Sequence, residues 1–161
     1  MIEVPLIIST DGSKGDRRSG TRWIITLIDG THIVSGFNPN FGQFKAIISY
    51  RAKIYTSLAA VLFLQLYSEY HNISTQNQYQ PVCDNEVYVN KLTWLLEEDF
   101  HHHDFHKETK SEALQLILHL IPKQFTIKQV LGHQDDNTYE SELTIEAKLN
   151  IKTDEIATEN A

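Results

Sequence analysis

Apolar and polar positions alternate in a way that marks the first third of the chain as strands. β-Branched, aromatic and other apolar residues dominate three segments, at residues 4–10, 20–28 and 31–37. An Asp-Gly pair at 29–30 separates the second segment from the third, and this dipeptide is typical of a tight turn between antiparallel strands. The pattern therefore predicts an antiparallel meander of three strands.

A helical period follows, from about residue 48 to residue 70. Apolar residues recur there every three or four positions, and a second ridge of small or apolar residues also carries Lys53. The stripe consists of Tyr55, Leu58, Ala59, Leu62 and Leu66, and the ridge of Ser57, Ala60 and Leu64. A helix with two such faces is expected to be covered on two sides.

The rest of the chain alternates short strands with helices. Residues 79–84 predict a strand that stops at Asp84, and residues 85–98 predict a helix directly after it. Thr109 and Glu112 have the spacing of a capping box for a further helix, which Pro122 ends. Residues 125–131 predict a fifth strand and 141–157 a last helix. This order predicts an α/β fold with a mixed five-stranded sheet, in which three antiparallel strands are joined by two strands from helical crossovers and helices flank the sheet.

The composition fits one ordinary globular domain over residues 1–161, with 41% hydrophobic and 22% charged residues. Its longest apolar run is far shorter than the roughly 20 residues that span a bilayer. A single cysteine, Cys83, is compatible with a reducing compartment. We therefore expect an intracellular protein with no membrane partner, cytoplasmic or nuclear.

The net charge of −7 argues against a protein that grips nucleic acid through an overall positive field. The charge is uneven, however, because residues 1–56 hold seven Lys and Arg against four acids. The segment "KGDRRSGTR" at 14–22 contributes Arg17 and Arg18 to this basic part, and it is a candidate contact surface for a polyanion. The alternative for this segment is a soluble turn without a binding role.

Three aspartates stand where side chains are presented by strand ends or by a helix face. Asp11 ends the first predicted strand, Asp84 ends the fourth, and Asp154 shares an inward face of the last helix with Asn150. Buried carboxylates need partners, and oxygen ligands without His or Cys favour Mg²⁺ or Mn²⁺ over zinc. The alternative for each acid taken alone is a turn residue or a helix N-cap, with Asp84 a good candidate cap.

Five short motifs in this order resemble the ribonuclease H domain carried by reverse transcriptases of retroelements. They are "DGS" at 11–13, "YRA" at 50–52, "DN" at 84–85, "GHQD" at 132–135 and "LN" at 149–150 with "DEIA" at 154–157, and the resemblance runs from about residue 6 to 158. It implies a ribonuclease H fold that binds an RNA/DNA hybrid and hydrolyses the RNA strand with two Mg²⁺ (or Mn²⁺) ions roughly 3.5–4 Å apart. The rest of a reverse transcriptase polyprotein is an implied partner.

The resemblance also implies roles for individual residues. Asp11, Asp84 and Asp154 would be the metal ligands, and His133 would order the loop before the last helix. Further residues would support the ligands or position the substrate, namely Ser13, Asn85 and Asn150.

Lys53 occupies the position of the family's fourth carboxylate, the glutamate that follows "RA". Three carboxylates and one ammonium give a formal charge of −2 where four carboxylates would give −4. A unit charge ~4 Å from another is worth about 4 kcal/mol at an effective dielectric constant of ~20, which opposes binding of at least one metal ion. We expect Lys53 to pair with Asp11 and Asp84 as a fixed substitute for a metal, to stabilise the fold and to impair cleavage. The alternatives are a side chain that extends into solvent, and a lysine introduced deliberately to inactivate the protein.

Other polar and aromatic features have simpler interpretations. "HHHDFH" at 101–106 could be a zinc site, but consecutive histidines cannot all turn toward one ion without strain, which favours a solvated connection. Asp135 and Asp136 are expected in a solvated loop, with replacement of the missing ligand as the alternative. Three aromatic residues are expected in the core, namely Trp23, Phe37 and Tyr50.

Two functions from different classes follow. The first is a ribonuclease H-type domain that binds RNA/DNA hybrid and whose cleavage is impaired or absent because of Lys53. The second is a non-catalytic module of a retroelement protein that binds nucleic acid or connects domains. Another nuclease or a transposase on the same fold is a third interpretation, but the usual motif context of those enzymes is missing.

Overall fold

The computed structural model describes residues 5–14, 19–39, 49–72, 79–97, 111–121 and 126–159. Five strands form one sheet in the order β3-β2-β1-β4-β5. The strands are β1 (Leu6–Lys14), β2 (Ser19–Leu27), β3 (His32–Pro39), β4 (Tyr79–Cys83) and β5 (Lys128–Gln129). The helices are α1 (Ser49–His71), α2 (Glu86–Glu97), α3 (Ser111–Leu120) and α4 (Ile145–Glu159), with two short 3₁₀ turns, η3 (Gln134–Asp136) and η4 (Glu140–Glu142).

The first three strands form the predicted antiparallel meander. At the turn between β2 and β3, Gly30 has a φ of 86°, and the amide of Thr31 donates to Asp29 Oδ1 at 2.8 Å. One prediction is wrong: Asp11 does not end the first strand. Pairing of β1 with β2 continues to Lys14, so Asp11 lies within the strand opposite Arg22. The polar residues after Asp11 stay extended because β2 gives their backbone groups hydrogen-bond partners.

The last two strands join by crossovers, as predicted. β4 pairs in parallel with β1, and β5 pairs in parallel with β4. β5 is much shorter than the predicted 125–131, because β4 ends at Cys83 and offers backbone partners to only two residues of β5. The mixed five-stranded sheet is therefore confirmed. Thr109 and Pro122, which were expected to bound α3, lie outside the described residues.

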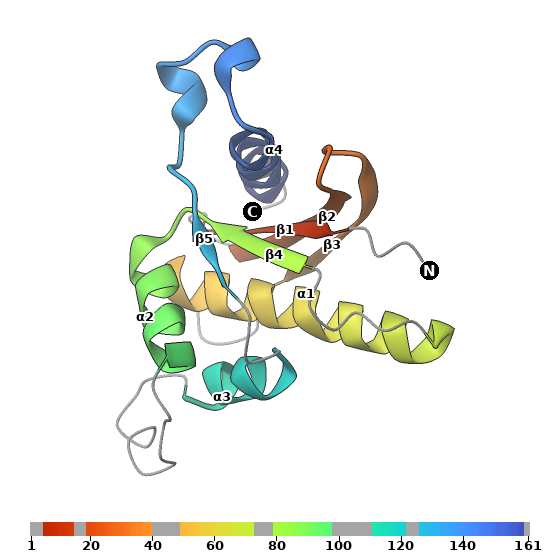
Figure 1. Cartoon of the computed structure of the whole chain (residues 1–161). Helices are drawn as coiled ribbons and strands as arrows, with labels where there is room; N and C mark the ends of the chain where they lie inside the picture. The colour runs from red at the N-terminus through yellow and green to blue at the C-terminus, as the bar shows by residue number, and fades with distance from the viewer. Residues whose placement is uncertain are drawn as a thin grey trace.

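Helices cover the two faces of the sheet (Figure 1). α4 packs on one face, where Ile7 and Ile24 are buried, and α1 packs on the other, against Ile8 and Ile25. α2 and α3 lie on the α1 side. Alternate residues of β1 therefore face different helices, as strand geometry requires. Among the helices that the structure describes, none has the length and apolar character needed to cross a bilayer.

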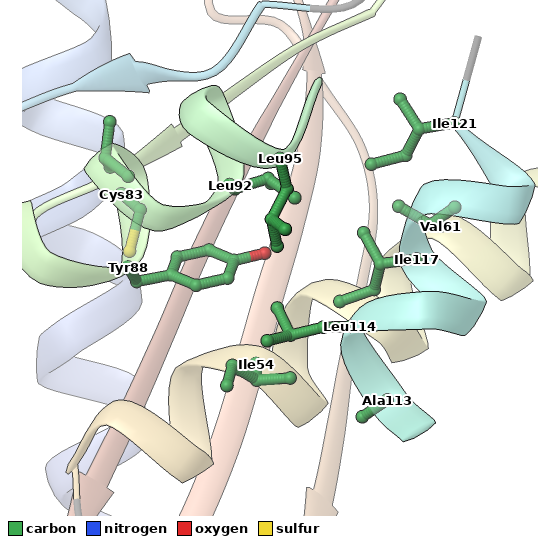
Figure 2. Close-up of a cluster of buried hydrophobic side chains, with 11 residues drawn as sticks. Ile54, Val61, Cys83, Tyr88, Leu92, Leu95, Ala113, Leu114, Ile117 and Ile121 are labelled. Atoms are coloured by element: carbon green, nitrogen blue, oxygen red, sulfur yellow. The ribbon is translucent and has the colours of Figure 1, made fainter. Parts of the chain in front are cut away.

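The largest buried cluster lies between α1, α2 and α3 (Figure 2). Ile54 and Val61 of α1 meet Leu114 and Ile117 of α3, and Tyr88 of α2 reaches into the same cluster. Further members are Cys83, Val89, Leu92, Leu95, Ala113 and Ile121. This packing fixes the position of α2, and hence of the residues between β4 and α2.

The prediction that α1 is covered on two sides is confirmed, because Ala60 and Leu64 pack against the sheet and Ile54 and Val61 pack against α3. The predicted stripe is not covered along its whole length, since Leu66 is 64% exposed where the last turns of the helix run past the sheet. Phe37, which was expected in the core, is not there. It lies on β3 at the edge of the sheet with 49% of its surface exposed, and the guanidinium of Arg22 covers its ring at 5.5 Å from the ring centroid. Trp23 is buried as expected.

Candidate functional site

Two of the predicted aspartates come together on neighbouring parallel strands. The β1–β4 register pairs Ser9 with Val82 at the end of β4. Continuing that register by two residues places Asp11 beside Asp84, which follows β4 directly. Because neighbouring strands lie about 4.8 Å apart, the two carboxylates can share one cation.

α1 crosses β1 closely at this point. A Cβ on Gly12 would lie only 2.6 Å from the Cβ of Ala52, so only glycine permits this approach. The Thr56 hydroxyl donates to the backbone oxygen of Asp11 at 3.2 Å and to that of Ala52 at 2.8 Å. The first turns of α1 are thus fixed against β1, and Lys53 is brought next to the two aspartates.

The Lys53 ammonium bridges the two carboxylates. Lys53 Nζ donates to Asp11 Oδ1 and to Asp84 Oδ1. Lys53 is only 5% exposed and Asp11 only 2%. Burial by itself would lower the pKa of Lys53, but the negative charges around it, with Asp11 foremost, outweigh burial and raise the pKa above its ordinary value. Lys53 is therefore a buried cation and not a free amine, and the alternative in which it extends into solvent is wrong.

Asp154 of α4 is the third carboxylate of this centre. Burial, together with a hydrogen bond to Asp11 and the negative charge of Asp11, raises the pKa of Asp154 to about 6. His133 Nδ1 lies 4.0 Å from Asp154 Oδ2, and the left-handed backbone of His133 (φ 51°) starts the η3 turn. Asp154 is half-buried, so it borders the solvent side of the centre. The three aspartates that the sequence singled out therefore meet around Lys53.

The structure also describes four other predicted residues, namely Asn85, Asn150, Asp135 and Asp136. Asn85 Oδ1 accepts from the amide of Tyr88 at 2.9 Å, so Asn85, and not Asp84, caps α2. Asn150 is buried, and its Oδ1 has no hydrogen-bond partner in the described part of the chain. Asp135 and Asp136 are exposed in η3, as expected for a loop.

Several predicted contact residues cannot be placed. Ser13 belongs to β1 by its backbone, but its side chain lies outside what the structure describes. Arg17, Arg18 and the histidines at 101–106 also lie outside the described residues. Their roles stay predictions.

Gly132 is a site residue that the sequence did not single out. A Cβ at this position would lie 3.2 Å from Asp84 Oδ2, which is tighter than a normal contact. Glycine therefore lets the loop after β5 approach the Asp84 carboxylate. The available signal was the glycine that opens "GHQD", directly after a predicted strand.

The residues of this centre do not fit the two-metal site that the resemblance implies. Lys53 uses one oxygen of Asp11 and one of Asp84, and Asp11 lies close enough to Asp154 to raise the pKa of that carboxyl. Within the described ranges, no three His, Cys, Asp or Glu side chains are arranged to hold a metal ion. Two of the three carboxylates in the donor set are already paired with an ammonium group.

Comparisons with known proteins were made for sequence and for fold. No protein-family model and no curated protein matches the sequence. Among solved structures, LC11-RNase H1 in complex with an RNA/DNA hybrid is similar with a TM-score of 0.64 and 16% identity, over 96% of this chain and 94% of that chain. RNase H1 from the archaeon Halobacterium salinarum has a TM-score of 0.56 and 14% identity, over 83% of this chain and 91% of that chain.

A viral structure is similar over nearly the whole chain. The prototype foamy virus protease-reverse transcriptase gives a TM-score of 0.66 with 15% identity, covering 98% of this chain but 21% of the viral one. The RNase H domain of the same virus, solved separately, gives a TM-score of 0.59 with 14% identity, over 98% of this chain and 93% of that domain. At these identities the likeness concerns the fold alone. Together with the strand order β3-β2-β1-β4-β5, it shows that the chain has the ribonuclease H fold.

Proposed function

We propose that this chain binds an RNA/DNA hybrid at the centre formed by Asp11, Asp84 and Asp154, and that it cleaves the RNA strand poorly or not at all. The fold supports the binding part, since LC11-RNase H1 was solved with such a hybrid. The proposed loss of cleavage rests on one observation: the Lys53 ammonium lies between two of the three carboxylates.

The physical reason is competition for the same oxygens. In two-metal nucleases, carboxylates hold the ions that activate the attacking water and stabilise the leaving oxygen. A divalent ion ~4 Å from the Lys53 ammonium would be repelled by about 8 kcal/mol at an effective dielectric constant of ~20. Lys53 is buried, so water screens this repulsion little. We therefore expect no efficient metal-dependent hydrolysis while Lys53 stays in place.

Cleavage of a labelled hybrid in Mg²⁺ or Mn²⁺ tests this proposal. The unchanged chain should give little or no product, and Lys53→Glu should gain activity because it restores a carboxylate at this position. Lys53→Gln is the matched control, since it removes the ammonium but supplies no charge. Robust cleavage by the unchanged chain would refute the proposed impairment.

Hybrid binding is measured separately, by fluorescence anisotropy at several salt concentrations. Arg17→Ala and Arg18→Ala should each lower the slope of log affinity against log salt by about one if the side chain contacts a phosphate. An unchanged slope would remove the segment at 14–22 from the binding surface. No hybrid binding by the unchanged chain would refute the binding proposal.

The second candidate is a non-catalytic module that connects domains of a retroelement protein. The same lysine favours it, because an ion-paired centre can stabilise a fold without any substrate. The foamy virus protein shows that a domain of this fold can be a fifth of a longer chain. Absence of hybrid binding combined with absence of cleavage by Lys53→Glu would favour this candidate over the first.

A further inference from the structure

We propose that fixed side-chain cations make hybrid binding by this chain independent of divalent metal ions, with Lys53 offsetting part of the negative charge of the centre and Arg22 contacting a phosphate beside it. This inference rests on the proposed function. The proposed function explains why cleavage is impaired, and this inference adds how the centre can still bind a polyanion.

The first step is the position of the built-in cation. Lys53 Nζ bridges one carboxylate oxygen on β1 and one directly after β4, where the two neighbouring strands bring their aspartates together. The side chain is covalently held, buried and paired with both carboxylates. A chelator cannot remove this charge, and dilution cannot lower its occupancy.

The second step concerns a further cation beside the centre. Arg22 is paired across the strands with Asp11, so the two side chains lie on the same face of the sheet. Lys53 and Arg22 together therefore offset two of the three negative charges of the aspartates without a metal ion. A phosphate that approaches such a centre meets less repulsion than it would beside three unpaired carboxylates.

The third step is the way in which Arg22 is held. The Arg22 guanidinium lies over the exposed ring of Phe37 at 5.5 Å from the ring centroid, so an aromatic face supports it. Arg22 forms no ion pair with another described residue, and its buried Nε has no hydrogen-bond partner among them. A planar guanidinium held in this way presents N–H donors suited to a phosphate.

The test measures affinity for a labelled hybrid in EDTA and in Mg²⁺, at matched ionic strength because salt alone changes such affinities. The unchanged chain should show affinities that agree within about twofold, which corresponds to roughly 0.4 kcal/mol. Lys53→Gln should bind more weakly in EDTA and recover in Mg²⁺, because its carboxylates become available to the ion. Lys53→Arg keeps the charge and should remain insensitive to Mg²⁺.

Arg22 is tested by the salt dependence of binding. Arg22→Gln should lower the slope of log affinity against log salt by roughly 0.9. Lys148→Ala, which removes an exposed cation of α4, is the matched control and should leave the slope unchanged.

The outcomes separate the inference from the proposed function. Binding in Mg²⁺ that is lost in EDTA would overturn the inference and leave the proposed function standing. Absence of binding under both conditions would overturn the two together. An unchanged salt slope for Arg22→Gln would overturn the assignment of a phosphate contact to Arg22.

Discussion

Replacing Lys53 by methionine should destabilise the fold strongly. The change keeps an apolar stem of similar size and removes the ammonium, which leaves the carboxylates of Asp11 and Asp84 without their partner. Removing one member of a buried ion pair costs about 3–5 kcal/mol, because the remaining charge is left unpaired. The Asp84 side chain is 22% exposed and regains some hydration, so we expect the lower end, about 3 kcal/mol.

Urea unfolding followed by circular dichroism measures this loss. For a domain of this size, about 3 kcal/mol corresponds to a drop in Tm of roughly 6–12 °C. Lys128→Met is the matched control: Lys128 pairs with Glu146 at 2.6 Å, but its side chain is 48% exposed. An exposed pair of this kind contributes at most about 1 kcal/mol. Equal and small losses for the two variants would refute the view that the buried bridge stabilises the fold.

The pH dependence of the Lys53 contribution has a definite sign. The pKa of Lys53 is raised in the folded state, so the stabilisation is fully present below the ordinary lysine pKa of about 10.4 and is lost only as pH rises through the higher folded value. The difference in unfolding free energy between the unchanged chain and Lys53→Met should therefore be the same at pH 7 and pH 10. A difference that disappears by pH 9 would contradict a buried, carboxylate-paired ammonium.

Four other positions give predictions for stability or for thiol reactivity. Gly12→Ala should cost about 1–3 kcal/mol or more in urea unfolding, because the new methyl group would meet Ala52 at 2.6 Å, and a stability equal to the unchanged chain would contradict the close crossing of α1 and β1. Asn85→Ala should cost about 1 kcal/mol through loss of the cap of α2, again by urea unfolding. Burial raises the pKa of the Cys83 thiol to about 11, so a thiol reagent at pH 8 should modify the folded protein only as fast as it unfolds, and rapid modification would place Cys83 at the surface. Leu66→Ser should change the free energy of unfolding by no more than about 0.5 kcal/mol, since this side chain is largely exposed, and a large loss would mean that α1 is covered there.

The order of the elements could be predicted from the sequence because each segment carries its own period. The ends of β1 and β5 could not, because strand ends depend on partner strands. The residues after Asp11 look like a turn in isolation, yet β2 pairs with them as far as Lys14. The two apolar faces of α1 predicted cover on two sides, which the sheet and α3 provide, but periodicity could not show where along the helix that cover ends.

The candidate site was predictable where an acidic residue lies near the end of a strand or on the inward face of a helix. Asp11, Asp84 and Asp154 meet around Lys53, and the parallel register explains why the first two are neighbours. Contacts that depend on backbone approach were not predictable. The role of Gly132 beside Asp84 required the three-dimensional path of the loop after β5.

The central position of β1 affects how the chain can fold as it is synthesised. β1 is made before its parallel neighbour β4, which pairs Val82 with Ser9, and before α4, which covers Ile7 and Ile24 and is the last helix in the described chain. Nascent chains that have not yet reached α4 must therefore leave one sheet face open to water. Such contacts between distant residues form slowly, so the unfinished domain depends on chaperones or on slow elongation to avoid aggregation at that face.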